Sequence, residues 1–186
     1  MAFTPDHVEA DIDRFRERIG QYVFISSASA YQAPPSRVPI TDGTSLWTLT
    51  HSEDFAEGFV PLLGSTRTLG EAFHITSDDL LAWNQIIMIL AKAAGAEPRI
   101  VHVPSDVIAA ADPDWGATLL GDSAHSMIFD NSKLRSVVPD YVATITLEQA
   151  APEIIAWHDE DQSRQRVDAD LDSLMDKLSA EFRRPG

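Results

Sequence analysis

The chain has 186 residues, 44% hydrophobic and 23% charged, which is the composition of one globular domain or of one domain with a small appendage. Its formal net charge of −15, from 14 basic and 29 acidic residues, disfavours nucleic acid and anionic membranes as partners, because both bind basic surfaces. It has no cysteine, which excludes disulfides, thiolate metal sites and cysteine nucleophiles and makes the cytoplasm the expected compartment. The most apolar run, 86–91, is too short to cross a membrane.

A helix followed by a buried strand is predicted at the start of the chain. Thr4 and Pro5 favour a helix start, apolar residues then recur at helical spacing, and Gly20 favours its end. The run 22–25 is apolar, β-branched and aromatic, as in a fully buried strand. Small hydroxyl residues follow it, at the end where parallel strands of open sheets place their functional groups. The competing interpretation is a strand that runs into a serine-rich loop without function.

The rest of the chain alternates between predicted strands and helices. Strands are predicted at 46–50, 72–75 and 99–103, and a loop at 112–121. Helices are predicted at 52–63, 80–94, 105–111, 130–139, 147–158 and 166–184. This order predicts an α/β fold: a partial Rossmann-like, mainly parallel sheet with flanking helices and a helical C-terminal portion.

The segment 25–31, Ile-Ser-Ser-Ala-Ser-Ala-Tyr, resembles the strand-end motif of the extended short-chain dehydrogenases/reductases, the NAD-dependent epimerase/dehydratase family. The resemblance implies that Ser27 is a catalytic residue, which hydrogen-bonds the reacting hydroxyl or carbonyl of the substrate. It also implies that Ser26, Ser29 and Tyr31 contact the substrate.

Three later segments resemble elements of the same family, in the same order. Trp47 to Ala56 is similar to its strand, histidine and acidic-pair element, and Glu71 to Ser77 to the strand that follows. Phe129 to Lys133 is similar to a helix start near the end of the family's chain. The resemblance extends from about Thr4 to the region of Trp157.

Two motifs of the family are missing from this sequence. It has no G-x-x-G-x-x-G turn, which holds the cofactor pyrophosphate on backbone N–H groups. It also has no Tyr-x-x-x-Lys, the proton-transfer pair of the family. We therefore expect the nucleotide-binding repeats to be absent before Met1 and an internal segment to be absent near Thr41 and Asp42. The sequence fits a shortened relative, a fragment, or a sequence from which residues have been left out. Residues 1–41 are interpreted as a remnant of the Rossmann domain and 42–186 as the C-terminal sheet and substrate-binding portion.

The resemblance implies an NAD(P)-dependent epimerase, dehydratase or reductase that acts on a nucleotide sugar or a similar hydroxyl or carbonyl compound. NAD or NADP is the implied cofactor. Because the cofactor motif and the Tyr/Lys pair are missing, we expect this chain neither to bind the cofactor tightly nor to turn it over. The alternative hypothesis is a non-catalytic remnant that acts as an oligomerising or partner-binding module. A homo-oligomer is expected in either case, because the strand at 22–25 would have an exposed edge.

Other chemistries have weaker support in the sequence. The six histidines show none of the H-x-x-x-H or H-E-x-x-H spacings of metal sites, and no metal site is predicted. His51, Glu53 and Asp54 form one tight cluster, which the preference of acidic residues for helix starts explains. The turn Gly121-Asp122-Ser123 is not a G-x-S-x-G nucleophile elbow.

Overall fold

The computed structural model describes residues 13–14, 20–21, 23, 43–98, 100–123, 125–165 and 168–182. Helices dominate this part of the chain. The strands are β1 (Leu46–Trp47) and β2 (Leu81–Ala82), and the α-helices are α2 (Ser52–Phe59), α3 (Trp83–Ala93), α4 (Ser105–Ala111), α5 (Pro113–Thr118), α6 (Ser132–Arg135), α7 (Leu147–Asp159) and α8 (Ala169–Phe182). Short turns of 3-10 helix lie at Val60–Leu62, Thr66–Thr68 and Gln162–Arg164, and a π-helical turn at Leu119–Ser123.

The predicted mainly parallel, Rossmann-like sheet is wrong. In the described ranges the sheet is a two-residue antiparallel pair, in which Leu46 lies opposite Ala82 and Trp47 opposite Leu81. The segment predicted as a strand at 72–75 is part of an extended stretch, but side chains and not a neighbouring strand bind the backbone of Thr76, just beyond it. Apolar and β-branched runs favour extended backbone, but they do not specify a pairing partner. The predicted strand at 22–25 lies outside the described residues, except for position 23.

Most of the predicted helices agree with the structure. Five of them are confirmed within a few residues, as α2, α3, α4, α7 and α8, and the one predicted at 130–139 is shorter, as α6. The predicted loop at 112–121 is wrong, because α5 and the π-helical turn occupy it. Asp112 explains α5: its carboxylate accepts hydrogen bonds from the N–H groups of Asp114 and Trp115, each at 3.0 Å, and Pro113 provides the first helical position.

The main hydrophobic cluster joins the 3-10 turn after α2, helix α6, the extended segment before β2 and the segment after α6. Leu62, Leu134 and Tyr141 form its buried centre, against which partly buried apolar residues pack at positions 73, 75, 137, 138 and 143. Gly58 permits the close approach of α2, since a Cβ atom there would lie 2.7 Å from the Ile75 side chain and 2.8 Å from the Tyr141 ring. The cluster therefore fixes the end of α2 against the segment that precedes β2 and the segment that follows α6.

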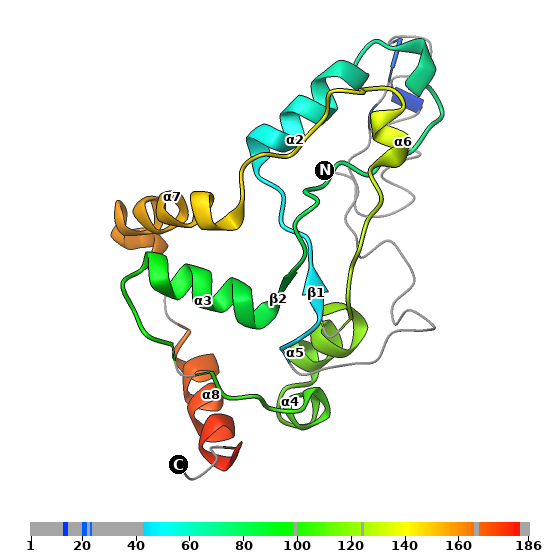
Figure 1. Ribbon diagram of the computed structural model, residues 1–186. Helices are drawn as coiled ribbons and strands as arrows, with labels where there is room; N and C mark the ends of the chain where they lie inside the picture. The colour runs from blue at the N-terminus through cyan, green and yellow to red at the C-terminus, as the bar shows by residue number, and fades with distance from the viewer. Residues whose placement is uncertain are drawn as a thin grey trace.

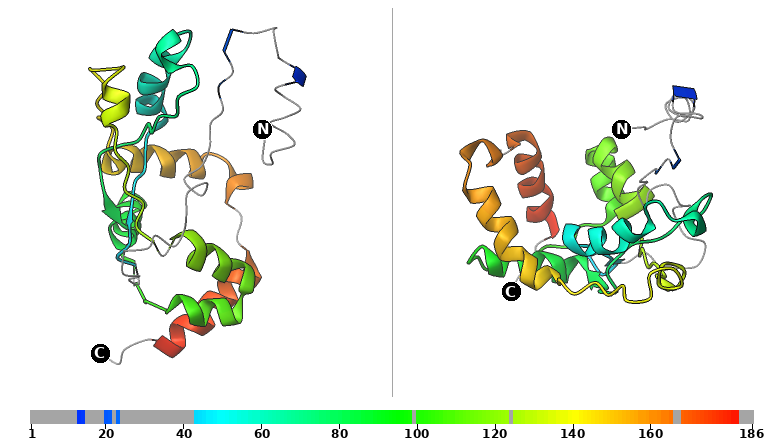
Figure 2. Two further views of the ribbon diagram at one scale, coloured as in Figure 1. Left: turned by 90° about the vertical axis from the view of Figure 1, so that its right-hand side faces the viewer. Right: turned by 90° about the horizontal axis from the view of Figure 1, so that it is seen from above.

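The molecule is elongated (Figure 1). α2 and α6 lie at one end, and α4, α5 and α8 lie at the other, with β1 and β2 between them (Figure 1). α7 packs against α3, and Figure 2 shows the two helices crossing. None of the helices in the described ranges combines the length and the apolarity needed to cross a bilayer.

Candidate functional site

The structure brings together the three segments 47–56, 71–77 and 129–133, which the sequence analysis singled out. Asn131 is buried, and its side-chain oxygen accepts hydrogen bonds from the N–H and the hydroxyl of Thr76, each at 3.2 Å. The Asn131 amide nitrogen donates to the Thr76 carbonyl at 2.8 Å. The N–H of Ser77 donates to the Thr50 hydroxyl at 2.9 Å. Side chains from positions 50 and 131 thus hold the extended segment 76–77 between them.

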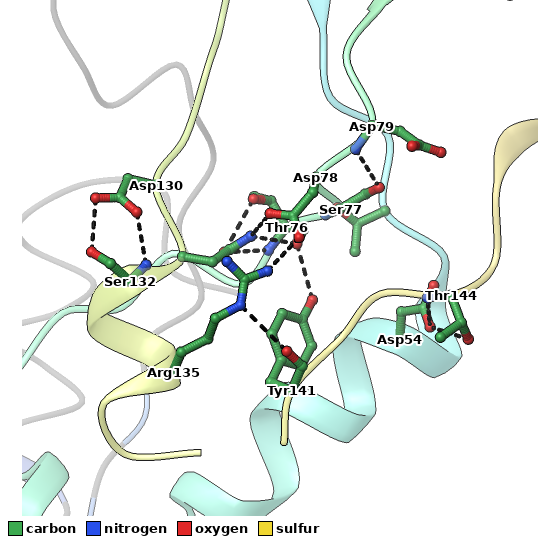
Figure 3. A network of polar contacts seen from close by, with 12 residues as sticks. Asp54, Thr76, Ser77, Asp78, Asp79, Asp130, Ser132, Arg135, Tyr141 and Thr144 are labelled. Atoms are coloured by element: carbon green, nitrogen blue, oxygen red, sulfur yellow. Dashed lines mark hydrogen bonds and ion pairs between the residues drawn. The ribbon is translucent and has the colours of Figure 1, made fainter. Parts of the chain in front are cut away.

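Tyr141 also binds the backbone of Thr76. Its hydroxyl donates to the Thr76 carbonyl at 3.0 Å, beneath the ion pair that Arg135 forms with Asp78 (Figure 3). Burial raises the pKa of the Tyr141 hydroxyl above its ordinary value, and the negative charges of Asp54 and Asp78 act in the same direction. The phenol therefore stays protonated and keeps its role as a hydrogen-bond donor.

Asp54, on α2, binds the segment that leads into α7. The carboxylate is buried and accepts hydrogen bonds from the backbone N–H groups of Thr144, at 3.0 Å, and Ile145, at 2.9 Å (Figure 3). Bonds of backbone donors to a buried carboxylate are among the stronger hydrogen bonds in proteins. Asp54 is therefore a structural anchor that fixes the chain where it enters α7. We refer to Thr50, Asp54, Thr76, Ser77, Asn131 and Tyr141 as the polar network.

A groove of about 420 Å³ opens beside this anchor, between the segment that enters α2 and the exposed side of α7. Its lining residues are Leu49, Thr50, His51, Ser52, Ile145, Thr146, Leu147, Ala150, Glu153, Ile154 and Trp157. Most of these side chains are apolar, and Ile154 and Trp157 remain exposed at the surface. A concave, mostly apolar surface with a few polar groups at its edge is the usual form of a small-molecule site.

His51 and Glu153 are the titratable groups of the groove. Nδ1 of His51 accepts a hydrogen bond from the N–H of Glu53 at 3.2 Å and so caps α2. In the neutral imidazole the proton is then on Nε2, which lies 3.7 Å from a carboxylate oxygen of Glu153. Nδ1 is therefore occupied by the helix cap, whereas Nε2 faces the Glu153 carboxylate without a direct hydrogen bond.

The cations near the polar network are engaged in ion pairs or hydrogen bonds. Lys133 contacts Glu71 at 2.7 Å, and the Arg67 guanidinium donates to the Ser136 carbonyl at 2.8 Å. In the part of the chain that the structure describes, no group of three or more His, Asp or Glu side chains is arranged to hold a metal ion.

The predicted site residues Ser26, Ser27, Ser29 and Tyr31 lie outside the described residues, so their roles stay predictions. The sequence reasoning missed the groove on α7, although Glu153 and Trp157 share a helix face at a spacing of four residues. It read His51 and Asp54 as an ordinary helix start, whereas the structure places them at the groove and at its anchor.

Comparisons of the chain with protein-family models, with curated proteins and with solved structures each found no match.

Proposed function

We propose that this chain is a relative of the NAD-dependent epimerase/dehydratase family that binds a hydroxyl- or carbonyl-bearing small molecule in the groove. Because its sequence lacks the cofactor and proton-transfer motifs, we propose that it transfers no hydride itself. The observation that carries the proposal is the polar network. Thr50, Thr76 and Asn131 come from three segments that were singled out for their resemblance to the family, and their side chains bond to one another or to the segment between them. The three segments follow one another in the same order as in the family, and they meet in space. This arrangement supports a common ancestry of the three segments with that family.

The proposed loss of hydride transfer rests on the missing motifs. A dinucleotide pyrophosphate is bound by backbone N–H groups approached through glycines, and the chain has no glycine-rich turn. Tyr141 does not replace the missing tyrosine, because its hydroxyl is buried and donates to Thr76, and the residue four positions later is Ile145. In a complete relative, Ser27 would orient the substrate oxygen. The cytoplasm remains the proposed compartment.

Calorimetric titration tests this proposal. Phenyl β-glucoside is a suitable probe, because it combines an apolar ring with uncharged hydroxyls, and NAD⁺ and NADP⁺ are titrated in parallel. We expect saturable binding of the glucoside, with affinity lost in Trp157→Ala, and no binding of either cofactor. Micromolar binding of NAD⁺ would overturn the loss of hydride transfer. A glucoside that does not bind at all would overturn the groove as the site.

A second candidate function, a self-associating module, is favoured by the surface of α3. Ile87 and Met88 are 42% and 50% exposed, and Lys92 is the sole charged residue of this helix. A helix that is apolar on most sides is usually buried, and an uncharged face lets two strongly acidic chains approach each other. Sedimentation velocity of the parent and of Ile87→Lys decides this. A dimer that dissociates in the variant supports the module, and a monomeric parent rejects it.

A further inference from the structure

The electrostatics of the groove restrict the ligand further than its shape does. Among the lining residues Glu153 carries a negative charge, and there is no lysine or arginine. The Glu153 side chain is 78% exposed, so it is available to a ligand in the groove. The whole chain adds a net charge of −15 around it. An anionic ligand therefore enters a region of negative potential in which no lysine or arginine lines the groove.

Helix N-termini attract anions, and both α2 and α7 begin at the groove, but each of these ends carries a side-chain cap. His51 caps α2, and Thr146 and Gln149 form a capping box at α7. The first turns also carry Glu53 and Glu148, whose charges offset the helix dipoles. The buried carboxylate of Asp54 takes two more backbone N–H groups at the entrance to α7. One N–H group in the first turn of each helix, and two more at the entrance to α7, thus already have an acceptor within the chain.

Arg164 is the cation that lies next to the groove. Its guanidinium stacks on Trp157, 4.1 Å from the ring centroid, and donates to the Trp157 carbonyl. It also lies 3.8 Å from a carboxylate oxygen of Glu160 and 3.9 Å from one of Asp161. Its charge is therefore compensated by two acidic residues outside the groove. Its position shows in addition that the Trp157 ring accepts a cation on its face.

We propose that the groove selects a ligand with a flat apolar body and a protonated amine, and discriminates against carboxylate and phosphate groups. The apolar body lies on Ile154 and Trp157, and the ammonium group lies beside the Glu153 carboxylate. This inference rests on the proposed binding function and narrows the class of ligand. A nucleotide sugar, which carries two phosphate charges, is disfavoured, and an amino alcohol, which has no phosphate group, is favoured.

Three probes of nearly equal size test the charge preference: 2-phenylethylamine, 2-phenylethanol and 3-phenylpropionate, titrated into the full chain at neutral pH and low salt. We expect the amine to bind most tightly and the carboxylate most weakly. Glu153→Gln should reduce the affinity for the amine about two- to fivefold, as for a partly exposed ion pair, and leave the alcohol unchanged. Glu181→Gln, on the distant helix α8, is the matched control and should change none of the three.

The outcomes separate this inference from the binding function on which it rests. Equal or tighter binding of the carboxylate would overturn the charge preference and leave the groove as a binding site. An amine affinity that Glu153→Gln does not change would likewise overturn it. If phenyl β-glucoside binds but none of the three probes does, the ligand class is wrong while the groove stands. If the glucoside also fails, the groove itself is not the site.

Discussion

The polar network and the groove are neighbours that differ in how their polar groups are used. Thr76 and Asn131 satisfy each other by direct hydrogen bonds, and Asp54 binds two backbone N–H groups. In the groove, the Glu153 side chain is 78% exposed and Trp157 is 57% exposed. Buried polar groups are stable only when they are fully paired, whereas a surface that binds a ligand must keep interactions available. The difference indicates that the network holds the structure and that the groove is open to a ligand.

The largest effect on stability is expected for Asp54→Ala. The substitution leaves two backbone N–H groups, of Thr144 and Ile145, without their acceptor. Each hydrogen bond to a charged group contributes roughly 1.5–3 kcal/mol, so the free energy of unfolding should fall by about 4 kcal/mol. Urea denaturation followed by circular dichroism measures this. Phenyl β-glucoside binding should be lost as well, since Ile145 lines the groove.

One outcome would contradict this interpretation of Asp54. A variant with nearly unchanged stability would show that the carboxylate does not anchor the entrance to α7. Glu53→Ala provides the matched control, because Glu53 is exposed and lies one position away on the same helix. Its effect should stay below about 1 kcal/mol.

The next effect in size is expected for Gly58→Ala, which tests the packing below the polar network. The added Cβ would lie 2.7 Å from Ile75 and 2.8 Å from the Tyr141 ring, both closer than atoms can pack. Overpacking of this kind costs about 1–3 kcal/mol. Thermal unfolding of the parent and the variant measures this loss of stability. Gly20→Ala is the control, because a Cβ atom at Gly20 would have no neighbour within 4 Å. Gly64→Ala is less suitable, because Gly64 has a φ of 72°, at which any side chain strains the backbone.

Asp54 and Thr76 show how much of the fold could be predicted from the sequence alone. Helices were predicted well because their signals, the apolar period and the caps, are local. The role of Asp54 was missed because its partners lie some 90 residues further along the chain. The parallel sheet was wrongly predicted for a similar reason: Thr76 is bound by Asn131 and Tyr141, and no pattern near position 76 reports this.

Trp157→Ala should separate binding from stability. The side chain belongs to a residue that is 57% exposed, and its ring contact with Arg164 is at the surface. Loss of an exposed cation–π contact costs about 0.5–1 kcal/mol, so the unfolding transition should barely move. Probe binding in the groove should nevertheless disappear in calorimetry. A strong loss of stability would instead make Trp157 part of the core of the fold.

The smallest effect concerns the exposed ion pair between Lys133 and Glu71, which lies outside the polar network. The hydrogen bond from Lys133 lowers the pKa of the Glu71 carboxyl below its ordinary value, and the lysine charge adds to this. A lowered pKa in the folded state means that the pair stabilises the fold above the ordinary pKa of glutamate. That contribution is lost as the pH falls through the folded-state pKa.

Carboxyl NMR titration of Lys133→Met measures this pair directly. Methionine keeps an apolar group near the Phe73 ring, over which the ammonium lies at 5.1 Å, and removes only the charge and the donor. The Glu71 midpoint should rise toward its ordinary value, while Lys92→Met, on α3, should leave it unchanged. Stability at neutral pH should change little, because exposed ion pairs contribute little to folding. A Glu71 midpoint that is the same in parent and variant would show that the pair does not form in solution, and the polar network would then hold its end of the molecule without help from the surface.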